Sequence, residues 1–325
     1  MVPSGTYTMP PPGEYEVRSL RRADYARYRP LVGLAVGSFE RSTGLDMVAD
    51  ASIDQLSRRW VWFLLGLLRW FGRPLMDVLV AVDAGEVVGT GSILWLPRTA
   101  YVAGIVTKPE VRGRGVASRI LSAQADFARR RHRDWLALDV ESENATALRL
   151  YRAAGYRETG RFSWFTRTDV PPIESPPSSL APPVGVSEWP SVIARLDASR
   201  PAEYRAAFPA GPRLLHHNEI MVRGPAMQHG TWRRELDGGG VALVRAYYVS
   251  ATGMRVYFPI TTAPEPSADA LVGPIDAASE WLRPFAPTRI LAVAPEPRAG
   301  IAAVLERKGF AAASSTVAMI RRSSA

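Results

Sequence analysis

The sequence predicts an α/β layer fold with a mixed central sheet, duplicated in tandem. Three observations support it: strand-like apolar runs alternate with helical ones, a Pro- and Ser-rich segment divides the chain, and a pattern of the first half recurs in the second. A length of 325 residues suits two domains of about 150 residues each, and 47% apolar residues suffice for a core in both.

The elements of the first half follow from their apolar patterns and turn residues. The predicted strands are 15–18, 78–82, 87–96, 100–107, 135–140 and 161–168. The predicted helices are 23–34, 54–71, 116–131 and 145–154. Gly155 ends the last of these helices, because glycine readily takes the left-handed conformation that closes a helix.

A linker between two domains is predicted where proline and serine concentrate. Six prolines fall between Asp169 and Pro183, a composition that continues neither a helix nor a central strand. We therefore expect a first domain over 14–169, a semi-rigid linker over 170–183 and a second domain over 184–325. In the second domain, the three glycines 238–240 predict a hairpin turn.

The second half repeats the end of the first half at a constant offset. Shifted by 154 residues, 136–140 falls on 290–294 and 151–156 falls on 305–310, without a gap. A strand, a helix, a glycine and an aromatic residue recur in that order, which indicates duplication of one domain.

The polar residues of the first half are not kept in the second. The turn 112–117 falls on 266–271, a stretch that holds no glycine. The same shift sets Asp139, Asn144 and Tyr151 against Val293, Arg298 and Leu305. If the first copy performs chemistry, the second has lost the groups for it.

Composition excludes several classes of function. Without cysteine there is no disulfide, no thiol nucleophile and no thiolate zinc site. The net charge of +9, from 40 basic and 31 acidic residues, suits acidic ligands but is too diffuse to indicate a nucleic-acid partner. His216, His217 and His229 lack companions at metal-ligand spacing, so we expect surface or packing histidines and no metal.

Neither a membrane span nor a targeting segment is predicted. The most apolar helix runs from Trp60 to Phe71, and its uncharged run ends at Arg69, well short of the roughly 20 residues that a span needs. It could pack within or between domains or subunits, line a hydrophobic substrate site or touch a membrane surface. Residues 1–16 lack the order of a signal peptide, so we expect a cytoplasmic protein. A homodimer and a monomer with pseudo-dimeric halves both remain open.

A glycine- and arginine-rich turn is the first candidate for a binding site. It follows a predicted strand and opens a predicted helix, and its first half reads Val111-Arg112-Gly113-Arg114-Gly115. The first N–H groups of a helix have no internal partner and lie at the positive end of the helix dipole, so they bind phosphate. Tight turns of this composition also occur in purely structural loops.

The run 105–117 resembles the acetyl-CoA motif of the GNAT N-acetyltransferase superfamily, with Arg112, Gly115 and Ala117 at its defining positions. A downstream stretch resembles the second motif of that superfamily; it comprises Leu138, Asp139, Val140, Asn144, Ala147, Leu150, Tyr151, Gly155 and Tyr156. The resemblance covers about residues 14–168. It is greatest to the branch that acetylates protein amino termini, such as the ribosomal-protein alanine N-acetyltransferases. The second half resembles a degenerate GNAT copy, an arrangement also found in tandem enzymes such as mycothiol synthase.

The resemblance implies acetyl-CoA as the acyl donor and assigns residues to it. The backbone of Ile105, Val106 and Thr107 would hold the pantetheine arm and the thioester carbonyl. The amides that would hold the pyrophosphate belong to Gly113, Arg114, Gly115, Val116, Ala117 and Ser118, next to Arg112. Asn144 would also contact the donor, although an ordinary helix N-cap explains it equally well.

Two residues are implied in catalysis. Tyr151 would give a proton to the departing thiolate, although an aromatic packing residue could also stand there. Asp139 occupies the position of a glutamate that is thought to act as the base in the N-terminal acetyltransferases. The shorter side chain favours a water relay over direct proton abstraction.

These observations predict an acetyl-CoA-dependent N-acetyltransferase that acts on a primary amine of a small molecule or peptide. Only the neutral amine attacks a thioester, so a group that takes up the proton accelerates transfer by about 10²–10⁴-fold. Without cysteine, we expect direct attack in a ternary complex. The alternatives are a protein N-terminal acetyltransferase and a non-catalytic acyl-CoA-binding sensor or assembly module.

Overall fold

The computed structural model describes residues 15–43, 76–211, 214–222, 227–249, 253–263, 267, 269–285, 289–296 and 299–324. The chain forms two compact units. The first comprises 1–38, 48–136 and 322–325, and the second comprises 39–47 and 137–321. We describe each unit by itself.

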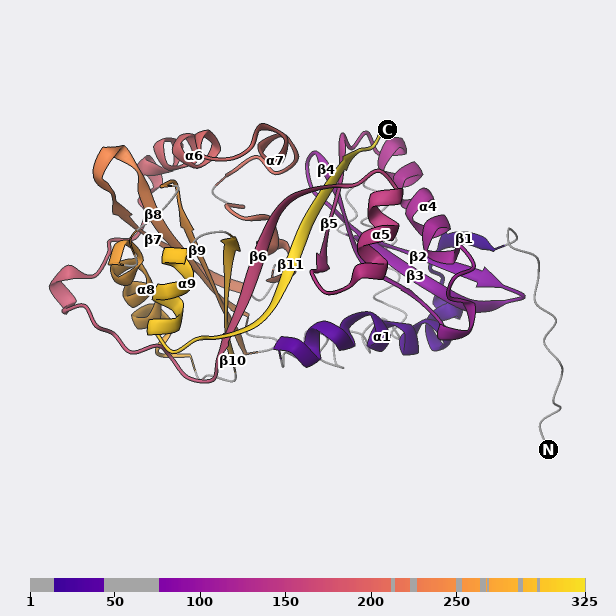
Figure 1. Ribbon diagram of the computed structural model, residues 1–325, viewed down its shortest axis with the longest axis horizontal. Coiled ribbons are helices and arrows are strands. Elements are labelled where there is room, and N and C mark those ends of the chain that lie inside the picture. Colours follow the sequence, from indigo (N-terminus) through magenta and orange to yellow (C-terminus); the bar gives the residue numbers. More distant parts are fainter. Residues whose placement is uncertain are drawn as a thin grey trace. The chain divides into compact units, whose positions relative to one another are not determined.

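The first unit contains an antiparallel meander (Figure 1). Its strands are β1 (Glu16–Ser19), β2 (Met76–Asp83), β3 (Glu86–Trp95) and β4 (Thr99–Thr107), paired in that order. Strands rich in Val, Ile and Ala suit a sheet that is buried on both faces. The burial agrees with this composition, since every residue of β2 from Leu79 to Asp83 is buried.

One helix covers each face of this meander. Helix α4 (Val116–Arg130) packs Val116 and Ile120 against Ala81 and Val88 on one face. On the other face, Tyr28 and Leu31 of α1 (Tyr25–Thr43) pack against Val80, Val82 and Val87. The two helices therefore fix the end of β4, from which the turn at 112–115 leads into α4.

The second unit holds a larger mixed sheet in the order β5-β11-β6-β10-β9-β8-β7 (Figure 1). Its strands are β5 (Trp135–Glu141), β6 (Arg157–Arg167), β7 (Met227–Glu235), β8 (Val241–Val249), β9 (Met254–Thr261), β10 (Arg289–Glu296) and β11 (Ala311–Arg322). Strands β9 and β10 are parallel, whereas β6 is antiparallel to both β10 and β11. The strand that the sequence predicts at 161–168 is therefore central in this sheet.

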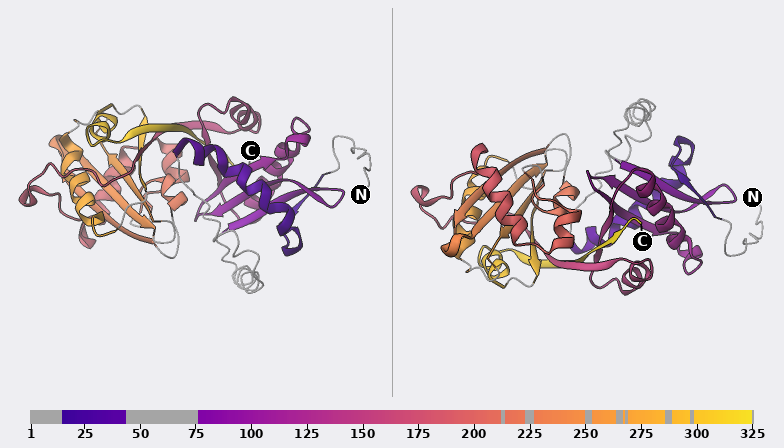
Figure 2. Two further views of the ribbon diagram at one scale, coloured as in Figure 1. Left: turned by 90° about the horizontal axis from the view of Figure 1, so that it is seen from below. Right: turned by 90° about the horizontal axis from the view of Figure 1, so that it is seen from above.

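Helices also lie on both faces of the second sheet (Figure 2). Helices α8 (Asp269–Leu282) and α9 (Ala299–Arg307) share one hydrophobic core with Ala242, Val244 and Ala246 of β8. On the opposite face, α6 (Trp189–Ala198) packs against Val241 and Leu243. The second unit also contains the short helices α5 (Ala145–Ala153) and α7 (Ala202–Ala207) and several 3-10 helices.

The proline-rich segment after β6 is anchored by a buried ion pair. Lys308 and Asp276 are both fully buried and hydrogen-bond to each other. Lys308 Nζ also donates to the carbonyl of Pro172 at 2.9 Å, and Asp276 Oδ2 accepts the backbone N–H of Ser175 at 2.8 Å. The linker predicted as a semi-rigid tether thus packs against α8 and α9 where it is described.

The predicted elements outside 44–75 are confirmed, with bounds that differ by at most four residues except in one helix. That helix, predicted over 23–34, is α1 and continues to Thr43, nine residues beyond the predicted end. The predicted helix 54–71, with its Trp60–Phe71 stretch, lies outside the described residues. The glycines 238–240 form the turn between β7 and β8, as predicted. The domain bounds 14–169 and 184–325 stay a prediction.

The offset of 154 residues recurs in the structure. β5 and β10 begin at Trp135 and Arg289, and α5 and α9 span Ala145–Ala153 and Ala299–Arg307. The glycines that follow these helices, Gly155 and Gly309, both have positive φ, at 84° and 77°. One strand-helix-glycine unit is therefore built twice on the same pattern.

Candidate functional site

The turn before α4 has a left-handed backbone at two glycines and leads into a helix without a side-chain cap. Gly113 and Gly115 adopt φ of 76° and 79°, in the left-handed region that favours glycine. Gly115 is the N-cap of α4, and no side chain caps the helix. The first turn of α4 holds no acidic residue, so its N–H groups stay electropositive.

A β-bulge shapes the strand that leads to this turn. Thr90 pairs with Val106 and Ser92 with Ala103, so β4 has one residue more than β3 at this point. Gly104 lies within the bulge at φ 60°. A bulge bends its strand and breaks the regular ladder. The residues predicted to hold the pantetheine arm, Ile105 to Thr107, follow directly.

Close packing of glycine holds α4 against the sheet. A Cβ atom on Gly89 of β3 would lie 2.9 Å from Val116 Cγ1 and 3.2 Å from the carbonyl oxygen of Val106. Only glycine therefore fits between the first turn of α4 and the end of β4. In the first unit, this contact brings together the two predicted donor-binding segments.

The remaining predicted site residues lie in the second unit, on β5 and α5. Asp139 Oδ1 lies 3.0 Å from Nε2 of His217, and the two side chains are 11% and 1% exposed. The other ring nitrogen of His217, Nδ1, lies 2.8 Å from the hydroxyl of Tyr204. Asp139, His217 and Tyr204 thus form a continuous hydrogen-bonded chain, which we call the Tyr-His-Asp chain.

Sequence reasoning missed two members of this chain. It took His217 as a surface or packing histidine and gave Tyr204 no role, because neither lies near Asp139 in sequence. The ring of His217 does pack, with its centroid 4.8 Å from that of Phe162. The packing prediction was therefore right, but the hydrogen bonds of this ring were not foreseen. His217 begins a short 3-10 helix far along the chain from β5, so only the tertiary fold could place residue 217 beside residue 139.

Tyr151 lies on α5 and is 9% exposed. Burial raises the pKa of its phenol to about 12, so the hydroxyl keeps its proton near neutral pH. Its ring meets that of Tyr156 edge to face at 5.9 Å. The side chain can therefore both pack and donate a proton.

Asn144 is the N-cap of α5, and its Oδ1 accepts the backbone N–H of Ala147 at 3.0 Å. The ordinary helix-cap interpretation thus accounts for this oxygen. A contact of Asn144 with an acyl donor stays a prediction.

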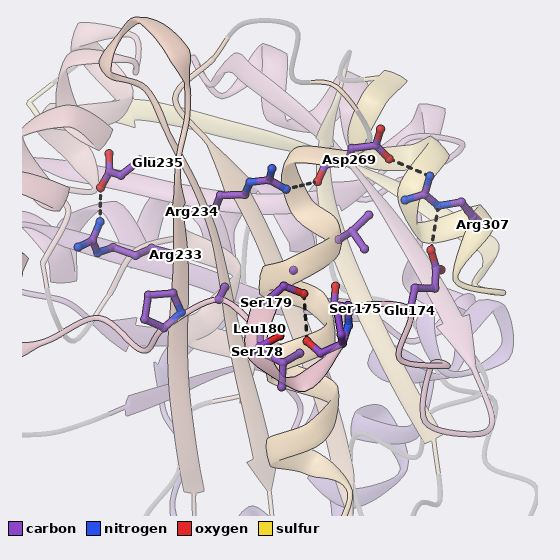
Figure 3. Close-up of a pocket in the computed structure, with 15 residues that line it drawn as sticks. Glu174, Ser175, Ser178, Ser179, Leu180, Arg233, Arg234, Glu235, Asp269 and Arg307 are labelled. Carbon is purple, nitrogen blue, oxygen red and sulfur yellow. Dashed lines mark hydrogen bonds and ion pairs between the residues drawn. The ribbon is translucent and has the colours of Figure 1, made fainter.

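Two cavities are lined entirely by described residues of the second unit. The larger, of about 770 Å³, opens between the linker and α8 (Figure 3). Its arginines are paired: Arg307 with Asp269 and Glu174, and Arg233 with Glu188 and Glu235. The smaller, of about 200 Å³, is lined by residues of β6, β9, β10, the α6–α7 connection and His216.

The described residues contain neither a group of metal-binding side chains nor a helix that could span a membrane. No group of three or more His, Cys, Asp or Glu side chains in those ranges could hold a metal ion. Likewise, no helix of the described ranges is long and apolar enough to cross a membrane.

A bulged strand, a glycine turn and an uncapped helix thus follow one another in an α/β fold, and a free helix N-terminus of this kind can bind an anion. Residues 45–156, about a third of the chain, match the model of the acetyltransferase (GNAT) family. The "Uncharacterized N-acetyltransferase YhfO" of Bacillus subtilis (strain 168) is 31% identical over 91 residues. That match spans 26% of this chain and 61% of the relative's length. The segment is therefore similar to GNAT acetyltransferases.

Solved structures extend the likeness to the whole chain. A "Tandem GNAT protein from the clavulanic acid biosynthesis pathway" is 17% identical with a TM-score of 0.55, over 95% of this chain and 99% of that one. A "GCN5-related N-Acetyltransferase from Sphaerobacter thermophilus" is 17% identical with a TM-score of 0.57, over 97% of both chains. At this identity the likeness concerns the fold, which is that of GNAT acyltransferases in tandem. The closer similarity to ribosomal-protein alanine N-acetyltransferases stays a prediction.

Proposed function

We propose that the protein transfers an acetyl group from acetyl-CoA to a primary amine of a small molecule or peptide. The observation that carries the proposal is the uncapped, glycine-led N-terminus of α4, which lies inside the segment that matches the GNAT family. The whole-chain fold of a tandem GNAT adds support. The GNAT relatives act with acyl-CoA donors, and acetyl-CoA is the donor proposed here.

The residues of the first unit fit such a donor. The N–H groups from Gly113 to Ser118 would hold its phosphates, since no side chain competes for the N-terminus of α4. Backbone groups of Ile105, Val106 and Thr107 would hold the pantetheine arm. Ile105 lies in the bulge and has no partner on β3, whereas Val106 and Thr107 pair with Thr90 and Gly89. When bound, the thioester supplies the acetyl group.

The residues of the second unit would manage protons. Tyr151 holds a proton at its phenolic oxygen, because burial keeps its pKa at about 12, and can give it to a leaving thiolate. Asp139 accepts a hydrogen bond from His217, so we infer that its carboxylate acts on the imidazole rather than on the amine itself. The proton acceptor would then be the histidine, which the carboxylate orients.

Calorimetric titration of acetyl-CoA tests the donor site. We expect one site in the wild type, lost in an Arg112→Ala, Gly115→Glu variant, because a carboxylate at the helix N-terminus repels phosphate. Arg283→Glu replaces an exposed arginine directly after α8, which pairs with Glu280, and serves as the charge-matched control because both variants lower the net charge by two. Two sites would mean that the second half also binds the donor, and no binding would refute the proposal.

Transfer itself is tested by the release of free thiol with a panel of small amines and peptides. Acetyl-CoA binding without release in any reaction would favour a non-catalytic sensor. Release only with peptides that have a free amino terminus would favour a protein N-terminal acetyltransferase.

A further inference from the structure

The smaller pocket of the second unit lies where two parallel strands separate. β9 and β10 pair from Met254 with Arg289 to Tyr257 with Ala292, but they continue to Thr261 and Glu296. The ends of β9 and β10, which no longer pair with each other, line the pocket together with Gly160 to Phe162 of β6. None of the residues predicted for the donor or for catalysis lines it.

One wall of the pocket is the end of the Tyr-His-Asp chain. Tyr204 lines the pocket and is 7% exposed. A carboxylate only accepts hydrogen bonds, so Nε2 of His217 donates to Asp139. In the neutral imidazole Nδ1 is then an acceptor, and the Tyr204 hydroxyl donates to it. The Tyr204 oxygen also accepts the backbone N–H of His217 at 3.4 Å, so one of its two lone pairs is left to accept a further hydrogen bond.

The other wall offers hydrogen-bond donors. His216 also lines the pocket and is 6% exposed. Its Nδ1 accepts the backbone N–H of Asn218 at 3.3 Å, so Nε2 carries the hydrogen, and this buried atom has no partner. Burial lowers the pKa of His216, which keeps the ring neutral. Arg200 adds a cation whose guanidinium also donates to the carbonyl of Leu215.

A ligand that matches these walls carries both a hydrogen-bond donor and an oxygen acceptor. The charged lining residues are Arg161, Arg200 and Glu296, which leaves a net charge of +1 and favours an anionic group near the arginines. At about 30 Å³ per water, a volume of about 200 Å³ admits a small molecule only.

We propose that this pocket binds a small zwitterion with a primary ammonium next to a carboxylate, of the amino-acid class. The carboxylate meets His216 Nε2 and Arg200, and the ammonium meets the Tyr204 oxygen. Resting on the proposed function, this names the acceptor class of the acetyl transfer.

The Tyr-His-Asp chain makes the amine of such a ligand reactive. The N–H bond of the ammonium breaks and its proton passes to the Tyr204 oxygen, while the hydroxyl proton of Tyr204 moves to His217 Nδ1. The products are a neutral amine and an imidazolium that faces the Asp139 carboxylate. Only the neutral amine is nucleophilic, so the transfer prepares it for acylation.

Ligand-observed saturation-transfer NMR on the full chain tests the binding without acetyl-CoA. The probes are L-alanine and L-glutamate. Two comparison ligands each lack one of the charged groups: propionate lacks the ammonium, and ethylamine lacks the carboxylate. We expect both amino acids to bind about tenfold or more tightly than propionate or ethylamine, because each charged group adds its own hydrogen bond. Equal binding of propionate would overturn the ammonium contact, and no binding of any amino acid would overturn the proposal.

Conservative variants locate the binding. His216→Phe keeps the ring that packs on Phe162 but removes the donor, and Tyr204→Phe removes the acceptor oxygen. Each should weaken L-alanine binding about tenfold or more. Tyr156→Phe changes a buried tyrosine of the same unit outside the pocket and should leave binding unchanged. Unchanged binding in both pocket variants would refute the assignment, whereas a failure of acetyl transfer would leave these binding results standing.

Discussion

At the scale of single residues, burial determines which side chains keep their protons. Tyr151 and Tyr156 are neighbours with edge-to-face rings, and burial raises the pKa of both phenols. Their expected roles differ because Tyr156 has a buried hydroxyl with no hydrogen-bond partner, whereas Tyr151 is the proposed proton donor. The two tyrosines therefore provide a matched pair for mutation.

Tyr151→Phe should lower kcat by about 10²–10⁴-fold, the usual contribution of a positioned proton donor, and leave acetyl-CoA affinity unchanged. Tyr156→Phe, which removes a buried and unpartnered hydroxyl, should keep the wild-type kcat. Both are measured by thiol release and by calorimetry. Wild-type turnover of Tyr151→Phe would exclude this residue as the proton donor.

At the scale of elements, the site depends on how closely α4 approaches β3. Gly89 permits this approach. Gly91, two residues further along β3, also packs closely against α4, because a Cβ atom there would lie 2.9 Å from Gln124 Nε2. Gln124 is fully buried on α4, and its Nε2 donates to the carbonyl of Ser92 at 3.0 Å. Small residues on the strand thus set the position of the whole helix, including its N-terminus.

Gly89→Ala should destabilise the protein by about 1–3 kcal/mol, because the added methyl group overlaps Val116 and the Val106 carbonyl. It should also weaken acetyl-CoA binding, since the N-terminus of α4 must shift. The control is Gly33→Ala on α1, which meets no atom within 4 Å and should be stabilising by up to about 1 kcal/mol. Urea unfolding and calorimetry measure both effects, and a Gly89→Ala protein with wild-type stability and affinity would contradict this account of the packing.

At the scale of the whole molecule, buried tyrosines make stability depend on alkaline pH. Burial raises the pKa of Tyr28, Tyr151, Tyr204 and Tyr257 to about 12 each. Their pKa in the unfolded chain is about 10. Between these values the unfolded chain loses phenolic protons and the folded chain keeps them, so the unfolded state gains stability as the pH rises.

The free energy of unfolding should therefore be unaffected by these tyrosines below about pH 10 and fall up to about pH 12. The slope is about 1.4 kcal/mol per pH unit for each tyrosine, and Tyr151→Phe should reduce it by that amount. Urea unfolding followed by circular dichroism across this range measures the slope. A wild-type slope retained in Tyr151→Phe would contradict the raised pKa of this residue.

Local sequence was enough to predict the elements around the turn. The run from Val111 to Ala117 carries its conformation in its own glycines, and both Gly113 and Gly115 have the positive φ that glycine favours. The spacing of apolar residues predicted a helix over 116–131, and α4 ends one residue earlier, at Arg130. The prediction succeeded because amphipathic burial is a local pattern. The offset of 154 residues was also readable, since duplication preserves spacing.

The sequence by itself thus determined the α/β elements, their repeat and the glycine turn, all of which depend on neighbouring residues in the chain. Only the tertiary structure decided that β6 lies between β10 and β11 and that His217 bonds to Asp139. Strand pairing and buried hydrogen bonds join residues far apart in the chain, and the free energy that selects one partner over another comes from burial of the whole sheet. No local pattern contains that choice.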